Sequence, residues 1–186
     1  MAYLHAPLFN AGMKAVAPVR KALKVRTIFN LLGPLVNPCL PTHQLLGVAD
    51  LTLMRLYTNT LQQLGMDFAV VNNLDGYDEI SLTDEFKVMT NRYEKIYSPT
   101  DFGLPVFQQK ELYGGDTPET AAQIFDNVLQ NRATKAQTEC VLTNAAFAIQ
   151  TLCPDKTIET CLQEARQSME SGKAYQTLQK FIELNS

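Results

Sequence analysis

The chain has 186 residues, of which 46% are hydrophobic, and a formal net charge of -3. This length suits one domain, or one domain with part of another, and the apolar content suffices for a sizeable core. The weakly acidic balance argues against a general nucleic-acid-binding protein, because such proteins carry a basic surplus. No apolar run approaches the roughly 18 residues that a membrane span needs.

Cysteine usage and the first residues of the sequence indicate a compartment. The four cysteines have neither CxxC spacing nor neighbouring histidines: Cys39, Cys140, Cys153 and Cys161. This pattern predicts free thiols rather than a disulfide framework or a zinc site. The segment from Met1 to Pro7 lacks the charged region and long apolar core of a signal peptide. We therefore expect a cytoplasmic protein.

The first predicted element is helical and spans residues 11–32. Its apolar residues recur at roughly helical spacing: Met13, Val16, Val19, Leu23 and Ile28. Pro18 interrupts the pattern, so we expect either a kink or two abutting helices at this residue. The element stops at Gly33-Pro34, because glycine frees the backbone to turn and proline removes a hydrogen-bond donor. The prolines within residues 37–42 predict a linker.

A strand–helix–strand unit follows the linker. Residues 43–48 and 68–71 are short apolar runs that predict buried strands. Residues 51–64, between them, have helical periodicity that ends at Gly65. Strands connected through a helix are as a rule parallel neighbours. The predicted fold class is therefore α/β, with part of a parallel sheet flanked by helices.

Two further strands and a run of helices complete the chain. Residues 85–90 and 93–97 predict a hairpin, although its Asn91-Arg92 turn lacks the usual glycine. Asp116-Thr117-Pro118-Glu119 has the composition of a helix start. Helical periodicity then predicts four helices, over residues 121–129, 138–152, 157–169 and 173–184.

An acidic stretch, residues 72–79, comes directly after the second predicted strand. In parallel α/β sheets, ligands gather at the carboxyl ends of the strands. The adjacent carboxylates of Asp78 and Glu79 are hard oxygen ligands, which magnesium takes in ones and twos together with substrate phosphates. From the residues alone, a metal site that also holds a pyrophosphate and a solvated acidic loop are both open.

The basic helix before Gly33-Pro34 supplies a second candidate site. Arg20 carries a planar guanidinium that matches a carboxylate bidentately. The turn at Gly33 and Pro34 would let the backbone approach a flat ligand closely. The alternatives are a solvated arginine on a basic helix face and an ordinary helix end. Neither histidine has a serine or cysteine partner at a recognisable spacing, which argues against a hydrolytic triad.

Several of these segments contain the sequence motifs of one protein family. The most specific matches are Val19-Arg20, the run from Arg26 to Leu35, Asn37-Pro38, and Asp75-Gly76-Tyr77-Asp78-Glu79-Ile80-Ser81. Supporting matches follow in a consistent order: Gly114-Gly115-Asp116, Leu142-Thr143-Asn144-Ala145-Ala146, and Ser171-Gly172-Lys173-Ala174. Across nearly its whole length, the chain resembles the anthranilate phosphoribosyltransferases.

The resemblance implies a reaction and a set of site residues. Members of this family transfer the phosphoribosyl group of phosphoribosyl pyrophosphate (PRPP) to the amine of anthranilate in tryptophan biosynthesis, and the intact enzymes are expected to be homodimers. The resemblance implies that Asp78 and Glu79 bind Mg²⁺, that Arg20 contacts anthranilate, and that Gly33 and Pro34 line the acceptor channel. It assigns no acid–base catalyst and no nucleic-acid or membrane partner.

The same resemblance implies a domain division. Residues 1–37 correspond to a helical segment of a small all-helical domain with its hinge, and residues 38–186 to part of the α/β glycosyltransferase domain. The family's donor-binding Gly-Thr-Gly-Gly-Asp loop and its second phosphate-binding stretch have no counterpart in the sequence. Gly114-Gly115-Asp116 matches a late helix start of the family instead.

We therefore expect the C-terminal portion of such an enzyme, inactive alone. Two rival interpretations are a protein like the pyrimidine nucleoside phosphorylases, which share this architecture, and a non-catalytic remnant.

Overall fold

The computed structural model describes residues 9, 11–23 and 28–185, and for some residues of the N-terminal helices, Arg20 among them, it describes only the backbone. The chain divides after Thr42 into two compact units. The first contains helices α2 (Ala11–Leu23) and α3 (Ile28–Leu32) and the 3-10 turn η1 (Gly33–Leu35). Helix α2 runs through Pro18, so the expectation of two helices abutting there is wrong. Helix α3 ends directly before Gly33-Pro34, as predicted.

The second unit is a mixed α/β domain built on a four-stranded sheet in the order β1-β2-β3-β4. Strands β1 (His43–Gly47) and β2 (Asp67–Asn73) are parallel and are joined through α4 (Leu51–Gln63), which confirms the strand–helix–strand unit. Strands β3 (Phe86–Thr90) and β4 (Glu94–Tyr97) form the predicted hairpin.

The expectation of a parallel sheet holds for only one of the three strand pairs that the structure describes. Strand β3 runs antiparallel to β2. The connection between them, residues 74–85, contains no helix. A parallel return needs a crossover, usually through a helix, so this loop brings the chain back antiparallel. The sheet is therefore mixed.

The β3–β4 turn is stable without glycine because Asn91 binds it to the neighbouring strand. The Asn91 side chain accepts a hydrogen bond from the Phe68 N–H at 2.8 Å and donates one to the Met66 carbonyl at 2.9 Å. The Thr90 hydroxyl oxygen accepts from the N–H groups of Arg92 and Tyr93 at 3.1 and 3.0 Å. Side chains thus satisfy the polar groups of this turn.

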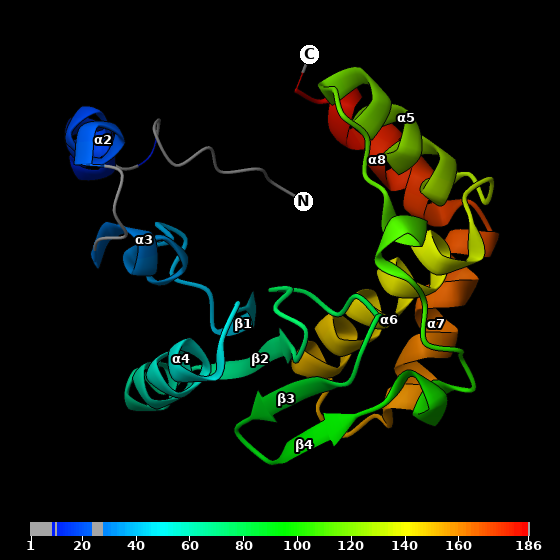
Figure 1. The fold of residues 1–186 in the computed structure, drawn as a ribbon, viewed down its shortest axis with the longest axis horizontal. Helices are drawn as coiled ribbons and strands as arrows, with labels where there is room; N and C mark the ends of the chain where they lie inside the picture. Colours follow the sequence, from blue (N-terminus) through cyan, green and yellow to red (C-terminus); the bar gives the residue numbers. More distant parts are fainter. Residues whose placement is uncertain (1–8, 10, 24–27, 186) are drawn as a thin grey trace. The chain divides into compact units, whose positions relative to one another are not determined.

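Helices follow the sheet in the predicted order, with boundaries within a few residues of those expected. They are α5 (Pro118–Leu129), α6 (Lys135–Leu152), α7 (Ile158–Glu170) and α8 (Lys173–Glu183), preceded by the 3-10 turns η2 (Pro99–Phe102) and η3 (Gln109–Leu112). Threonines cap α5, α6 and α7, each by accepting the backbone N–H of the third residue of the helix. Figure 1 shows α6 between the sheet and α7.

Both faces of β2 are covered. Ala69 and Val71 belong to the same buried cluster as Phe147 of α6. Because side chains alternate along a strand, Phe68 and Val70 point to the other face, where α4 packs on β2. This two-layer cover fixes β2, and with it the point at which the acidic loop begins. No helix in the described part of the chain has the length and apolar character of a membrane span.

A candidate metal site at the carboxyl ends of β1 and β2

The acidic loop, residues 74–85, leaves the carboxyl end of β2 and is organised by Asn73. This side chain is completely buried. Its oxygen accepts from the Ser81 N–H at 3.2 Å, and its amide donates to Asp75 at 2.6 Å. Asp75 also accepts from the Thr83 hydroxyl. The carboxylate of Asp75 is therefore occupied in shaping the loop.

Asp78 and Glu79 have a different environment. Both are exposed, and within the described part of the chain neither carboxylate forms a hydrogen bond or an ion pair. The described residues also contain no cluster of three or more histidine, cysteine or acidic side chains that would enclose a metal. A divalent cation here would have two protein carboxylates and would need further ligands from substrate or water.

The end of β1 approaches the acidic loop so closely that a side chain would not fit. A Cβ atom placed on Gly47 would lie 1.5 Å from the carbonyl oxygen of Asp78. Glycine in a strand often marks such a close approach of backbone. The carboxyl ends of the two parallel strands and the acidic pair therefore lie together, which is where α/β sheets bind ligands.

A groove of about 320 Å³ borders Glu79. Its walls come from the acidic loop and from helices α5 and α6, and they include Ser81, Phe125 and Cys140. Burial, together with the nearby charge of Glu79, raises the pKa of the Cys140 thiol to about 12. Cys140 is therefore a neutral thiol near pH 7, and its sulfur donates to the Ile80 carbonyl at 2.9 Å.

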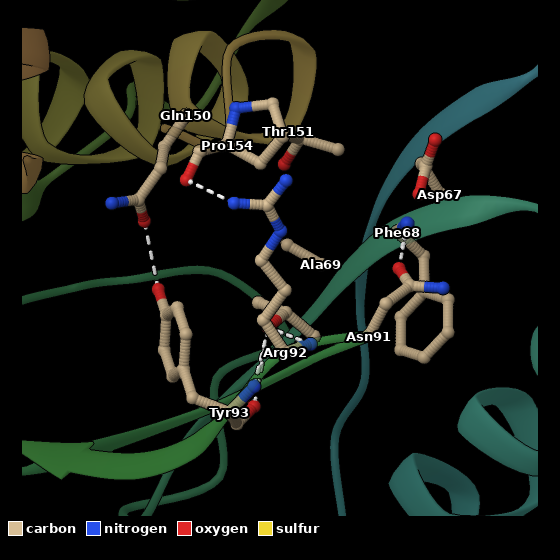
Figure 2. A pocket seen from close by; sticks show the side chains of 10 residues that line it. Asp67, Phe68, Ala69, Asn91, Arg92, Tyr93, Gln150, Thr151 and Pro154 are labelled. Atoms are coloured by element: carbon tan, nitrogen blue, oxygen red, sulfur yellow. Dashed lines mark hydrogen bonds between the residues drawn. The ribbon is translucent and has the colours of Figure 1, made fainter. Parts of the chain in front are cut away.

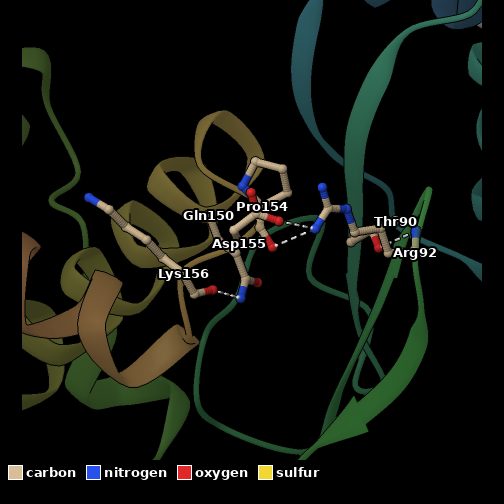
Figure 3. A network of polar contacts seen from close by, with 6 residues as sticks. All are labelled: Thr90, Arg92, Gln150, Pro154, Asp155 and Lys156. Atoms are coloured by element: carbon tan, nitrogen blue, oxygen red, sulfur yellow. Dashed lines mark hydrogen bonds and ion pairs between the residues drawn. The ribbon is translucent and has the colours of Figure 1, made fainter.

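A smaller hollow of about 60 Å³ lies against the other end of β2 (Figure 2). Here Tyr93 donates its hydroxyl to Gln150 of α6 at 2.7 Å, and burial is the main cause that raises the pKa of Tyr93. Arg92 donates to the Pro154 carbonyl at 3.1 Å and pairs with Asp155 at 2.6 Å (Figure 3). These contacts attach the hairpin to the α6–α7 connection, and none of the predicted site residues lines this hollow.

The predicted site residues fall into two groups. Asp78 and Glu79 are adjacent in the acidic loop of the second unit, and Gly33 and Pro34 are adjacent in the η1 turn of the first. Arg20 lies in α2, and its side chain is outside the described part of the structure.

Sequence reasoning missed the residues that hold the acidic loop. They are Gly47, Asn73, and two residues of α6, Cys140 and Asn144, whose side chains make hydrogen bonds to the backbone of Ile80. A signal was present for Asn144, because a polar side chain within a largely apolar helix must find a partner.

Residues 1–175 match the family described as "Glycosyl transferase family, a/b domain". The chain belongs to this family. It is 72% identical to the anthranilate phosphoribosyltransferase of Phocaeicola vulgatus over 186 residues, which are the whole chain and 56% of that relative. The enzyme of Cytophaga hutchinsonii is 51% identical over 179 residues, 96% of this chain and 55% of its own. The chain thus spans about half the length of these relatives.

Solved structures agree in fold. The anthranilate phosphoribosyltransferase of Thermus thermophilus is 30% identical, with a TM-score of 0.88 over 97% of this chain and 54% of that one. The Saccharomyces cerevisiae enzyme in complex with PRPP and Mg is 26% identical, with a TM-score of 0.86 over 96% of this chain and 51% of that one. The resemblance stated from the sequence motifs is confirmed.

Proposed function

We propose that this chain is part of an anthranilate phosphoribosyltransferase. The enzyme would transfer the phosphoribosyl group of PRPP to the amine of anthranilate and release pyrophosphate, as a step of tryptophan biosynthesis in the cytoplasm. One observation carries the proposal. Within a chain of this family, the exposed carboxylates of Asp78 and Glu79, unpaired among the described residues, lie at the carboxyl ends of two parallel strands.

The donor set of the acidic loop fits magnesium. Mg²⁺ is typically bound by one or two carboxylates together with substrate phosphates rather than by an all-protein cage. Asp78 and Glu79 supply two such carboxylates, while Asp75 is occupied by Asn73 and Thr83. A bound magnesium ion would offset the negative charge of the pyrophosphate. The role of the chain is to hold the two carboxylates side by side at the rim of the sheet.

The acceptor site belongs, in this proposal, to the first unit. The guanidinium of Arg20 would hold the carboxylate of anthranilate in a fixed orientation and leave the ortho amine free to attack. Gly33 has no positive φ, and among the residues that the structure describes nothing beyond its chain neighbours lies within 4 Å of the position of a Cβ there. Neither backbone conformation nor chain packing therefore demands glycine, which fits a position kept open for a flat ligand.

The remaining parts of the proposal concern the intact protein. Residues 1–37 would belong to a small helical domain with its hinge, residues 38–186 to the α/β domain, and the enzyme would be a homodimer. Donor phosphates would be bound by segments within the part of the relatives' length that this chain does not span. In this proposal Gly114-Gly115-Asp116 is a turn and helix start rather than a donor-phosphate loop, and this assignment is supported by Gly115, which has a φ of 91° and packs against the first turn of α5.

A chimera tests the function. In it, this chain replaces the matching 56% of the Phocaeicola vulgatus relative. We expect PRPP-dependent and Mg²⁺-dependent loss of anthranilate fluorescence, and no phosphorolysis of uridine or thymidine. The 186-residue chain alone should show no turnover under the same conditions. A folded chimera that leaves anthranilate unchanged but cleaves a nucleoside with phosphate would replace the proposal with the phosphorylase alternative.

A further inference from the structure

The loop that carries Asp78 and Glu79 is attached to helix α6 by one side chain. Asn144 accepts a hydrogen bond from the Ile80 N–H at 3.1 Å and donates one to the Ile80 carbonyl at 2.8 Å. Only one orientation of the carboxamide makes both bonds, since its oxygen must accept and its nitrogen must donate. Ile80 directly follows Glu79, so Asn144 holds the peptide bond that links these two residues.

The contact is fixed from the helix side as well. The Asn144 amide also donates to the Cys140 carbonyl, one turn earlier in α6, at 2.9 Å. The Cys140 thiol donates to the same Ile80 carbonyl that Asn144 contacts. The Ile80 side chain is completely buried in the core cluster that includes Phe147. The loop therefore cannot shift at Ile80 without breaking hydrogen bonds and core packing together.

A second constraint acts on the other acid. The carbonyl of Asp78 lies against Gly47, where even a methyl group would clash. The backbone of the acidic pair is thus held by β1 on one side and by α6 on the other, while both carboxylates stay exposed. Two adjacent negative charges repel each other, and a loose loop would let them separate. A clamped backbone keeps them together before any cation arrives.

We propose that Asn144 is a positioning residue for the acidic pair. It holds the Glu79–Ile80 peptide so that the Glu79 carboxylate is available, with Asp78, to a divalent cation that also binds pyrophosphate. The identity of the ligand rests on the proposed function. The contact between Asn144 and Ile80 does not depend on it. Residues that orient metal ligands, without touching the metal, typically change metal affinity by about 10–100-fold when they are replaced.

The test measures cation binding directly. Mn²⁺ serves as the probe, with and without inorganic pyrophosphate, and electron paramagnetic resonance gives the free Mn²⁺ in solutions of the chimera. Asn144→Ala should weaken pyrophosphate-dependent Mn²⁺ binding by about 10–100-fold. Asn144→Asp should weaken it as well, because a carboxylate can accept from the Ile80 N–H but cannot donate to the carbonyl.

Gln150→Ala is the matched control on the same helix. Gln150 also makes two side-chain hydrogen bonds to other elements, from the Tyr93 hydroxyl at 2.7 Å and to the Lys156 carbonyl at 3.0 Å, as Figures 2 and 3 show. Its replacement should lower thermal stability without changing Mn²⁺ binding. If Asn144→Ala does not fold, Cys140→Ala is the second variant. It removes only the thiol donor and should give a smaller change in the same direction.

The outcomes separate this inference from the proposed function. Normal Mn²⁺–pyrophosphate binding by folded Asn144→Ala, with faster hydrogen exchange at the Ile80 amide, would show that the contact is only structural and would overturn the inference. A chimera that binds Mn²⁺ and pyrophosphate in an Asn144-dependent way but does not consume anthranilate would support the inference and refute the function. Equal weakening in Asn144→Ala and Gln150→Ala would also overturn it, because general destabilisation would explain both.

Discussion

The two ends of strand β2 differ in whether the charged side chains beside them have protein partners. At the hairpin end, the guanidinium of Arg92 pairs with the carboxylate of Asp155. At the carboxyl end, the backbone is tightly held, yet the carboxylates of Asp78 and Glu79 have no partner within the described residues. Both ends are fastened to α6 or to the connection that follows it.

This difference between partnered and unpartnered charges distinguishes residues that stabilise the fold from residues that can bind a ligand. Partnered charges at the hairpin end contribute modestly to stability and bind nothing else. Unpartnered charges on a fixed backbone cost stability through repulsion and retain their capacity for a ligand. If this account is correct, changes at the carboxyl end should affect cation binding and turnover more than folding, and changes at the hairpin end should do the reverse.

The largest effect is expected from Asp78→Asn combined with Glu79→Gln. A metal ion contributes several kcal/mol of charge stabilisation, so the chimera should lose roughly 100-fold or more of its turnover at saturating anthranilate. Thermal stability should stay the same or rise, because the variant removes like-charge repulsion. Steady-state anthranilate fluorescence and a thermal melt check the two parts. A large fall in melting temperature would mean that the pair is structural.

Arg20→Ala sharpens the comparison because it should affect the anthranilate-binding site and leave the metal site unchanged. A direct charge-assisted pair with anthranilate is worth roughly 1.5–3 kcal/mol, so the apparent KM for anthranilate should rise about ten- to a hundredfold. The dependence of the rate on Mg²⁺ should not change. Lys21→Ala, its neighbour in α2, is the control. Equal, small effects of the two substitutions on the anthranilate KM would reduce Arg20 to part of a solvated basic face.

Gly47→Ala tests the clamp on the acidic loop. The new methyl group would collide with the Asp78 carbonyl, so the loop must move or the strand must shift, at about 1–3 kcal/mol of unfolding free energy. Denaturant unfolding measures the loss of unfolding free energy, and the same variant should bind Mn²⁺ more weakly. Gly114→Ala is the control, because no described residue beyond its chain neighbours comes within 4 Å of its Cβ position. Similar costs at both glycines would argue against the close approach.

The smallest effect is expected from Arg92→Ala at the hairpin end. Its partner Asp155 has a side chain 91% exposed, and exposed ion pairs are worth roughly 0.2–1 kcal/mol. Unfolding free energy should fall by no more than this amount, and turnover and Mn²⁺ binding should stay at the level of the unsubstituted chimera. Any marked loss of cation binding would erase the distinction between the two ends of β2.

The sequence predicted much of this fold because local signals and tertiary packing agree. Helix α4, for example, is bounded by Asp50, whose carboxylate accepts the Leu53 N–H at 2.8 Å, and by Gly65, whose φ is 66°. The antiparallel return of β3 was missed, because the absence of a crossover helix in residues 74–85 is a weak signal beside the preceding strand–helix–strand pattern.

The candidate site was predictable in part. Asp78 and Glu79 are adjacent in sequence and follow a strand, so the pair could be found without coordinates. The residues that hold the pair could not, because Gly47 and Asn144 are far from it along the chain and meet it only after folding. The pairing of Asn144 with Ile80, 64 residues away, depends on how α6 packs beside the sheet.

The central claim is that the acidic pair binds a divalent cation together with pyrophosphate. Calorimetric titration of Mg²⁺ into the chimera, with pyrophosphate present, tests it most directly. We predict a saturable heat that requires pyrophosphate and disappears in the variant that combines Asp78→Asn with Glu79→Gln, while Arg92→Ala retains it. Equal binding heats in the unsubstituted chimera and in the double carboxylate variant would contradict the account.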